Sequence, residues 1–246
     1  MPRFFVKTEQ IAENNISIIG EDVKHIKNVL RKQPGDILEI CNQETGKTYK
    51  TEILEINELR IENEIIEEIE SKEDKVKVDI YQGLPKADKM EFIIQKSIEL
   101  GVNAIIPVEM KRCVVKLDSK SESKKIERWQ KIAESAAKQS GRNIVPKIEH
   151  IIKIEEIAKL TDSYDSIIVC YENEKQNYIK NELLKLKNKK ELRIAVVIGP
   201  EGGLEEADVE CLKQNGAAIV TLGNRILRTE TVALNLLSII MYELEN

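Results

Sequence analysis

The chain is poor in the residues that build metal centres and disulfide frameworks. Its 246 residues include two histidines, His25 and His150, and four cysteines at Cys41, Cys113, Cys170 and Cys211. The cysteines lie far apart, in or beside apolar runs, and no two form a C-x-x-C pair. We therefore expect buried thiols in a reducing compartment, with neither a disulfide framework nor a zinc site. So few histidines also make a histidine-based metal site unexpected.

Long apolar runs are missing as well. No run reaches the roughly 18 residues that span a membrane, and the N-terminal residues MPRFFVKTEQ lack the apolar core of a signal peptide. We therefore expect a soluble, cytoplasmic protein. Only 11 residues are glycine and 6 are proline, which excludes collagen-like and low-complexity classes. Hydrophobic residues make up 41% and charged residues 33%, as in a globular chain with one large or two small domains.

Net charge is unevenly distributed. The whole chain carries −5, which taken alone favours small-molecule chemistry over a protein that coats nucleic acid. By segment, residues 1–74 carry −7, residues 75–150 carry +6 and residues 151–246 carry −4. A basic middle segment between acidic ends indicates a local surface for a polyanion, although ordinary solvated lysines would give the same count.

The first 70 residues predict a small β-barrel. Short apolar runs at 3–6 and 16–19 and alternating patterns at 36–41, 48–56 and 59–69 are typical of half-buried strands. One helix is expected over 22–32, with Val23, Ile26, Val29 and Leu30 on its apolar side. A barrel of about 70 residues fits this pattern.

From residue 75 the pattern changes to alternating strands and helices. We expect strands at 76–84, 104–108, 166–171, 193–198 and 217–222, and helices at 86–100, 122–139, 154–160, 176–189, 205–215 and 230–244. Continuous apolar strands of this kind predict a parallel sheet with helices on both faces. We expect Trp129 to pack in the core.

Glycine-rich loops follow two of these strands. Residues 199–203 read GPEGG and residues 223–231 read GNRILRTET, and each leads into a helix. Ligands of open α/β sheets bind beyond the carboxyl ends of the strands, where glycine lets the backbone approach closely. The first loop is neither a dinucleotide fingerprint nor a P-loop, so a plain turn is the alternative. Arg225 and Arg228 precede a helix start, where cations are disfavoured, which indicates a functional role.

Several motifs together resemble one known family. They are MPRFF at 1–5, HIKNVLR at 25–31 with Gly35-Asp36, KADKME at 86–91, KSIELG at 96–101, ERW at 127–129, AAKQSGR at 136–142, GPEGG at 199–203 and LGNRILRTET at 222–231. In this order they resemble the RsmE family, bacterial 16S ribosomal RNA uridine-N3 methyltransferases of the SPOUT superfamily. One departure is Val232, where the family pattern has alanine.

The resemblance implies a fold, a cofactor and partners. We expect an α/β protein with an N-terminal PUA-like RNA-binding β-barrel at 1–73. A SPOUT methyltransferase domain with a trefoil knot is expected at 74–246. The resemblance also implies S-adenosylmethionine as cofactor, no metal, a homodimer, and 16S ribosomal RNA or the small ribosomal subunit as substrate.

Site residues follow from the loops and the resemblance together. Catalytic roles are expected for Arg142, Arg228 and Glu201. Cofactor contacts are expected from Ile198, Gly199, Gly203, Leu222, Gly223, Ile226, Leu227 and Thr231. RNA contacts are expected from Arg3, Lys24, Arg31, Lys86, Lys89 and Arg112. Alternatives are a related methylase of another RNA, a catalytically silent ribosome assembly factor, and a small-molecule enzyme that binds phosphate at 199–203.

Overall fold

The computed structural model describes residues 3–70, 73–187, 189 and 191–245, and it divides into two compact units. Unit 1 comprises residues 1–73 together with 137–145, and unit 2 comprises 74–136 and 146–246. Met1 and Pro2, the start of the N-terminal motif, lie outside the described residues. No helix within the described ranges is long and apolar enough to cross a membrane.

Unit 1 is built on a six-stranded mixed sheet in the order β1-β4-β5-β6-β3-β2. Its strands are β1 (Arg3–Val6), β2 (Ile11–Ala12), β3 (Asn15–Ile19), β4 (Ile37–Asn42), β5 (Thr48–Ile56) and β6 (Arg60–Ile69). A short helix η1 (Thr8–Gln10) precedes β2. β1 pairs in parallel with β4, and the other pairings are antiparallel. No pairing between described residues joins β1 to β2, so the sheet curls without the closure that a complete barrel requires.

The helix predicted over 22–32 is shorter and irregular. It consists of α1 (Glu21–Lys24) followed by a π-helical turn, η2 (His25–Val29), and Arg31 then takes a φ of 52°. Val23 and Ile26 enter the unit 1 core with Phe4, Ile16 and Leu38, as predicted. The prediction for Val29 was wrong, because the wider π-helical turn leaves its side chain 66% exposed.

The end of helix α3 (Ser119–Ser140) and the loop after it belong to unit 1. Asn143 is buried; its side-chain amide donates to Thr48 Oγ1 at 2.5 Å and its Oδ1 accepts a 3.0 Å hydrogen bond from Arg3 Nη1. Arg142 binds the Glu73 carboxylate with N–O distances of 2.6 and 2.8 Å. These contacts make residues 137–145 part of the unit 1 structure.

Unit 2 contains a seven-stranded parallel sheet in the order β10-β8-β7-β12-β11-β13, with β9 paired to β8. The strands are β7 (Val76–Gly83), β8 (Ala104–Glu109), β9 (Lys147–Ile148), β10 (Ile152–Lys153), β11 (Ser166–Cys170), β12 (Leu192–Ile198) and β13 (Ala218–Val220). β12 is buried at every position except Arg193, because helices cover both faces of a parallel sheet. The predicted parallel sheet is confirmed.

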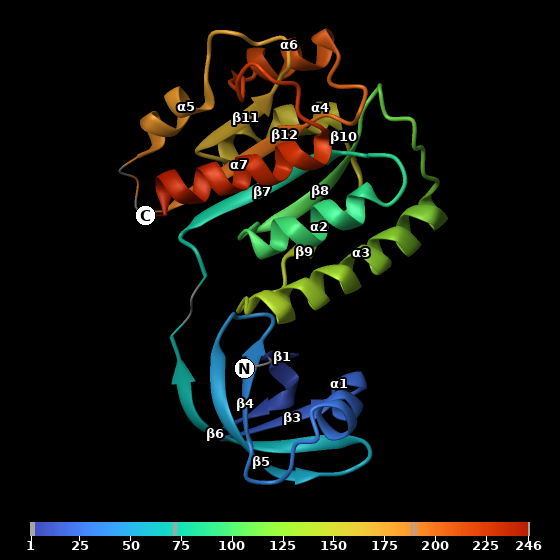
Figure 1. Ribbon diagram of the computed structural model, residues 1–246, viewed down its shortest axis with the longest axis vertical. Coiled ribbons are helices and arrows are strands. Elements are labelled where there is room, and N and C mark those ends of the chain that lie inside the picture. The colour runs from blue at the N-terminus through green and yellow to red at the C-terminus, as the bar shows by residue number, and fades with distance from the viewer. Residues whose placement is uncertain (1–2, 71–72, 188, 190, 246) are drawn as a thin grey trace. The chain divides into compact units, whose positions relative to one another are not determined.

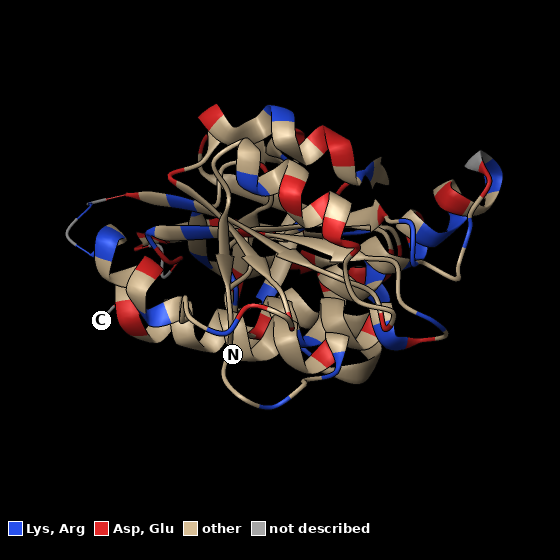
Figure 2. Ribbon diagram, turned by 90° about the horizontal axis from the view of Figure 1, so that it is seen from above, with Lys and Arg blue, Asp and Glu red and all other residues tan. Residues whose placement is uncertain are grey.

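Helices lie on both faces of this sheet (Figures 1 and 2). They are α2 (Lys89–Glu99), α3, α4 (Ile154–Ile157) with η3 (Ala158–Ser163), α5 (Ile179–Leu186), α6 (Glu206–Gln214) and α7 (Thr229–Leu244). α7 packs on β7, β12 and α2, and α4 packs on α6. Trp129 of α3 is buried, as predicted. Helix α2 begins at Lys89, so the predicted start at residue 86 was wrong. The intervening Ala87 has a φ of 52°, which a helix does not allow.

A buried polar cluster ties together the strands of unit 2. Asp79 of β7 is 1% exposed and accepts hydrogen bonds from Arg193, Asn103 and Tyr164 at 2.6 to 3.2 Å. The Tyr164 hydroxyl also lies 2.8 Å from that of Tyr81. The buried carboxylate is therefore satisfied by side chains from three other segments of unit 2.

Candidate functional site

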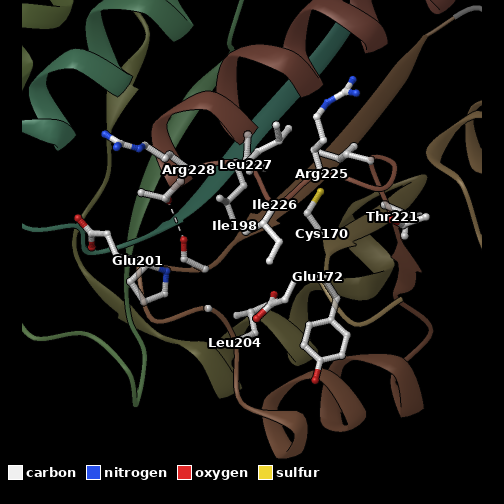
Figure 3. A pocket seen from close by; sticks show the side chains of 18 of the residues that line it. Cys170, Glu172, Ile198, Glu201, Leu204, Thr221, Arg225, Ile226, Leu227 and Arg228 are labelled. Carbon is white, nitrogen blue, oxygen red and sulfur yellow. Dashed lines mark hydrogen bonds between the residues drawn. The ribbon is translucent and has the colours of Figure 1, made fainter. Parts of the chain in front are cut away.

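The carboxyl ends of β11, β12 and β13 surround a cavity of about 450 Å³. Residues 170–172, 198–204 and 220–229 line it, together with Lys89, Lys175 and Val232. Figure 3 shows Arg228 and Glu201 toward one side of this cavity and Arg225 on the other, with Ile198 between them. The cavity lies where an open parallel sheet is expected to bind a ligand, and both glycine-rich loops contribute to it.

Two glycines allow the loop after β12 to fold tightly. A Cβ on Gly199 would lie 2.9 Å from the carbonyl carbon of Gly203, closer than packed atoms come. Gly203 has a φ of +72°, and a Cβ there would collide with the Glu172 carboxylate. The sequence GPEGG is therefore required by the geometry of the cavity wall, and a plain turn without these contacts does not account for both glycines.

The wall of the cavity combines apolar side chains with free backbone donors. Ile198 and Leu204 are buried beneath it, while Ile226 is 88% exposed. Among the described residues, none accepts a hydrogen bond from the backbone N–H of Leu222 or Leu227. An apolar surface edged by unpaired N–H groups suits a flat heterocycle with polar edges, because such a ligand supplies the missing acceptors.

A chain of hydrogen bonds holds the start of α7 against the loop after β12. Gln82 Nε2 donates to Thr229 Oγ1 at 2.8 Å, and Thr229 Oγ1 donates to the Gly199 carbonyl at 2.7 Å. Gln82 and Thr229 are both buried. The first bond joins β7 to α7 and the second joins α7 to the 199–203 loop, so the three segments are held together at the cavity.

Glu201 binds the segment that precedes α2. Its carboxylate lies 2.9 Å from Lys89 Nζ and accepts hydrogen bonds of 3.1 and 3.3 Å from the Lys86 N–H. Lys89 Nζ also lies 3.5 Å from Glu230 Oε2. Partial burial alone would raise the pKa of Glu201, but the hydrogen bonds from Lys89 and the Lys86 N–H outweigh it and lower the pKa. Hydrogen bonding to Glu201 raises the pKa of Lys89, so both groups are ionised at neutral pH.

The structure brings most of the predicted cofactor and catalytic residues together. Those that line the cavity are Ile198, Gly199, Gly203, Leu222, Gly223, Ile226 and Leu227, with Glu201 and Arg228. Thr231 lies in the first turn of α7 with its side chain exposed, and it is not part of the lining. Arg142 lies in unit 1, bound to Glu73, and is not part of the lining either.

The predicted RNA-binding residues fall into different environments. Lys24, Arg31, Lys86 and Arg112 are exposed. Arg3 is 7% exposed and engages Glu39 at 2.9 Å as well as Asn143 and the Gly141 carbonyl. The prediction of an RNA contact for Arg3 needs correction, because a buried guanidinium satisfied by protein groups cannot reach a phosphate.

Some lining residues were missed as cofactor or catalytic candidates. Lys89 was expected only to bind RNA. It lies beside Glu201, which is more than 100 residues away in the sequence, and no local sequence pattern reveals a contact of that kind. Cys170 is the last residue of β11, and Glu172 follows it. Their place at the ligand-binding edge of the sheet could have been inferred from the sequence, because Glu172 follows a buried strand of the same parallel sheet.

Comparisons with known proteins agree with this architecture. A sequence model described as an RNA methyltransferase domain matches residues 72–241, and one described as an RNA methyltransferase PUA domain matches residues 18–66. The ribosomal RNA small subunit methyltransferase E of Bacillus subtilis is 42% identical over 251 aligned positions, covering 100% of this chain and 98% of that protein. The protein of the same name from Mesomycoplasma hyopneumoniae is 33% identical, with 97% and 98% covered.

Solved structures give the same result. The Neisseria gonorrhoeae ribosomal RNA small subunit methyltransferase E, bound to S-adenosylmethionine, is similar with a TM-score of 0.86 and 31% identity, covering 99% of this chain and 98% of that one. A Legionella pneumophila methyltransferase, also in complex with S-adenosylmethionine, has a TM-score of 0.83 and 26% identity, with 98% and 96% covered.

The fold and the matched domains define an RNA methyltransferase with a PUA domain. Within that class, the chain belongs to the ribosomal RNA small subunit methyltransferase E family. The resemblance to the RsmE family is thereby confirmed.

Proposed function

We propose that the protein uses S-adenosylmethionine to methylate N3 of a specific uridine in 16S ribosomal RNA, on the small ribosomal subunit. Family membership supports the reaction, and the cavity supports the cofactor. The observation that carries the proposal is the glycine-lined cavity at the ends of β11, β12 and β13, with apolar walls and unpaired N–H groups at Leu222 and Leu227. An adenine ring fits these features, and two relatives bind this cofactor.

The cofactor-binding residues divide into two kinds. Ile198, Leu222 and Leu227 provide apolar contact for the adenine ring, with Ile226 at the rim. Gly199, Gly203 and Gly223 bring the backbone close to the ligand. When bound, S-adenosylmethionine supplies a sulfonium methyl group that an in-line nucleophile accepts, so the chain itself has to position and activate the uracil.

Activation of uracil requires the loss of its N3 proton, because the neutral imide is a poor nucleophile. We propose that Lys89 and Arg228 face the uracil oxygens and stabilise the negative charge that develops there. Glu201 orients the Lys89 ammonium. Its lowered pKa makes Glu201 a poor proton acceptor, so the N3 proton leaves directly to water. N3 lies on the pairing edge, so the target base has to leave any duplex.

The remaining parts of the proposal rest on the family resemblance. Residues 1–73 form the PUA-like RNA-binding domain and residues 74–246 the SPOUT domain, with a trefoil knot around the cofactor loops. Exposed Lys24, Arg31, Lys86 and Arg112 contact the RNA backbone. We also propose a cytoplasmic homodimer. The approach of α7 to the 199–203 loop through Thr229 is compatible with a knot.

One experiment tests the function. The protein is incubated with labelled S-adenosylmethionine and, separately, assembled small subunits, naked 16S RNA and transfer RNA, and the labelled base is then mapped. We expect 3-methyluridine at a single site in 16S RNA. Label in transfer RNA would identify another substrate, and cofactor binding without transfer to any RNA would favour an assembly factor.

A further inference from the structure

The start of α3 and the loop before it carry exposed cations without acidic partners. Lys116, Lys120 and Lys124, here called the α3 lysine strip, are all exposed, and no ion pair joins them to any residue that the structure describes. Other cations of the same stretch have partners. Lys125 lies over the Trp129 ring, 5.7 Å from its centroid. Ion pairs of 2.7 to 3.1 Å join Lys111 to Glu205, Arg128 to Glu91 and Lys131 to Glu127.

The acidic residues nearest in sequence are engaged elsewhere. Asp118 Oδ1 accepts a 2.7 Å hydrogen bond from the backbone N–H of Ser121, and backbone hydrogen bonding there lowers the pKa of Asp118. Glu122 accepts a 3.0 Å hydrogen bond from the Ile151 N–H. Both carboxylates thus satisfy backbone donors, and the strip keeps its positive charge.

This placement is unfavourable for the isolated protein. Lys120 lies in the first turn of a 22-residue helix, where the helix dipole disfavours cations, and Lys124 lies in the second turn. They are also four residues apart, so their ammonium groups lie on the same face and repel each other. Trp129 is 3% exposed and fixes the orientation of the helix, since it packs in the core from the side away from the strip.

We infer that the α3 lysine strip binds the phosphodiester backbone of the RNA substrate, an inference that rests on the proposed RNA methylation. Phosphate groups beside the strip would offset both the repulsion between the lysines and the unfavourable interaction of Lys120 with the dipole. Successive strip residues on the helix are about 6 Å apart at 1.5 Å per residue. Such contacts position the RNA without reading its sequence.

The test compares two variants that lose the same charge. The strip variant is K116Q/K120Q/K124Q. The control is K131Q/K185Q/K187Q, whose lysines are all exposed and have carboxylate partners. Binding to naked 16S RNA is measured over a salt series. For the strip variant we expect the slope of log K against log salt to become less steep by about 2, at roughly 0.7–0.9 per phosphate contact. The control keeps the wild-type slope.

Thermal melting of the free proteins separates binding from folding. We expect the strip variant to melt at or above the wild-type temperature, because unfavourable charges have been removed, while its RNA affinity falls. Wild-type affinity and slope in the strip variant would overturn the inference. The inference would also be overturned if the strip variant lost affinity for assembled subunits but kept its affinity for naked 16S RNA. That result would identify a ribosomal protein as the partner of the strip. A wild-type enzyme that binds RNA but methylates none would instead refute the proposed function.

Discussion

Lys89 Nζ lies 2.9 Å from Glu201 Oε1, joining the first residue of α2 to the loop after β12. Replacing Glu201 by Gln keeps the shape of the side chain and removes its charge. We expect methyl transfer to fall by about 10- to 100-fold, or roughly 1.4–2.8 kcal/mol, because Lys89 loses its orienting partner. The measurement is the single-turnover rate at saturating cofactor and RNA.

A matched control lies in the same loop. Glu205 also pairs with a lysine, Lys111, at 2.7 Å, but it is not part of the cavity lining. Glu205→Gln should leave the rate within about twofold of wild type. Equal losses of rate in Glu201→Gln and Glu205→Gln would show that the rate depends on the total charge of the loop and not on the contact with Lys89.

The Lys89–Glu201 pair should not titrate near neutral pH. The pKa of Glu201 is lowered and that of Lys89 is raised. The pair therefore stays ionised above the ordinary carboxyl pKa of about 4.3 and below the ordinary lysine pKa of about 10.4. We expect wild-type and Glu201→Gln enzymes to show rate profiles of the same shape between pH 6 and 9. An inflection present only in the wild type would contradict this assignment.

Gly203→Ala should weaken cofactor binding more than it weakens folding. A Cβ there meets the Glu172 carboxylate inside the cavity and forces a φ of +72° on alanine. Gly216→Ala has a similar backbone penalty at φ +90° but meets no atom within 4 Å. Both should lose about 1 kcal/mol of unfolding free energy. Calorimetry should show that S-adenosylmethionine affinity falls only for Gly203→Ala, and an unchanged affinity would exclude a role for this contact.

Arg3→Leu should destabilise unit 1. The substitution leaves Glu39, Asn143 and the Gly141 carbonyl without their buried donor. We expect a loss of about 2–4 kcal/mol in urea unfolding, since breaking a buried ion pair leaves its partner uncompensated. Lys7→Ala, at an exposed lysine 4.0 Å from Glu9, should cost less than about 0.5 kcal/mol. A stable Arg3→Leu protein with weakened RNA binding would restore the RNA-contact assignment.

The tyrosine cluster should make stability fall at alkaline pH. Burial, followed by the hydrogen bonds with Tyr81 and Asp79, raises the pKa of Tyr164 above its ordinary value of 10.0. The contribution of Tyr164 is therefore complete below about pH 10 and declines above it, as the unfolded chain releases a proton that the folded one retains. Urea unfolding between pH 9 and 11 should show a smaller decline for Tyr164→Phe than for wild type. Tyr178→Phe, at an exposed tyrosine, should follow the wild type.

Much of this architecture could be predicted from local sequence patterns. The strand at 48–56 was predicted with the bounds of β5, and the runs at 166–171 and 193–198 predicted β11 and β12 to within one residue. Buried parallel strands are continuous apolar runs, so the glycine loops that follow them could be located as a ligand site. The side chains of Val29 and Arg3 could not be placed this way. A π-helical turn shifts the apolar face, and the partners of Arg3 are 36 to 140 residues away.

Glu201 and Lys89 illustrate the same limit within the cavity. Each belongs to a motif that sequence reasoning selected, yet their contact depends on the strand order, which puts β7 beside β12. Neighbouring strands in a parallel sheet are often far apart in the chain. Local periodicity predicts the strands and where they end. Which loops lie next to each other depends on the strand order of the folded sheet.

Because residues 137–145 complete unit 1, that unit is discontinuous in the chain. A ribosome releases residue 3 early, but a partner of its guanidinium, Asn143, emerges only after residues 74–136 of unit 2 have been synthesised. An N-terminal fragment ending near residue 73 would therefore lack the hydrogen-bond partners that residues 141–144 provide to Arg3, Thr48 and Glu73. During synthesis, the N-terminal sheet can reach its final state only once β7, β8 and most of α3 have left the exit tunnel.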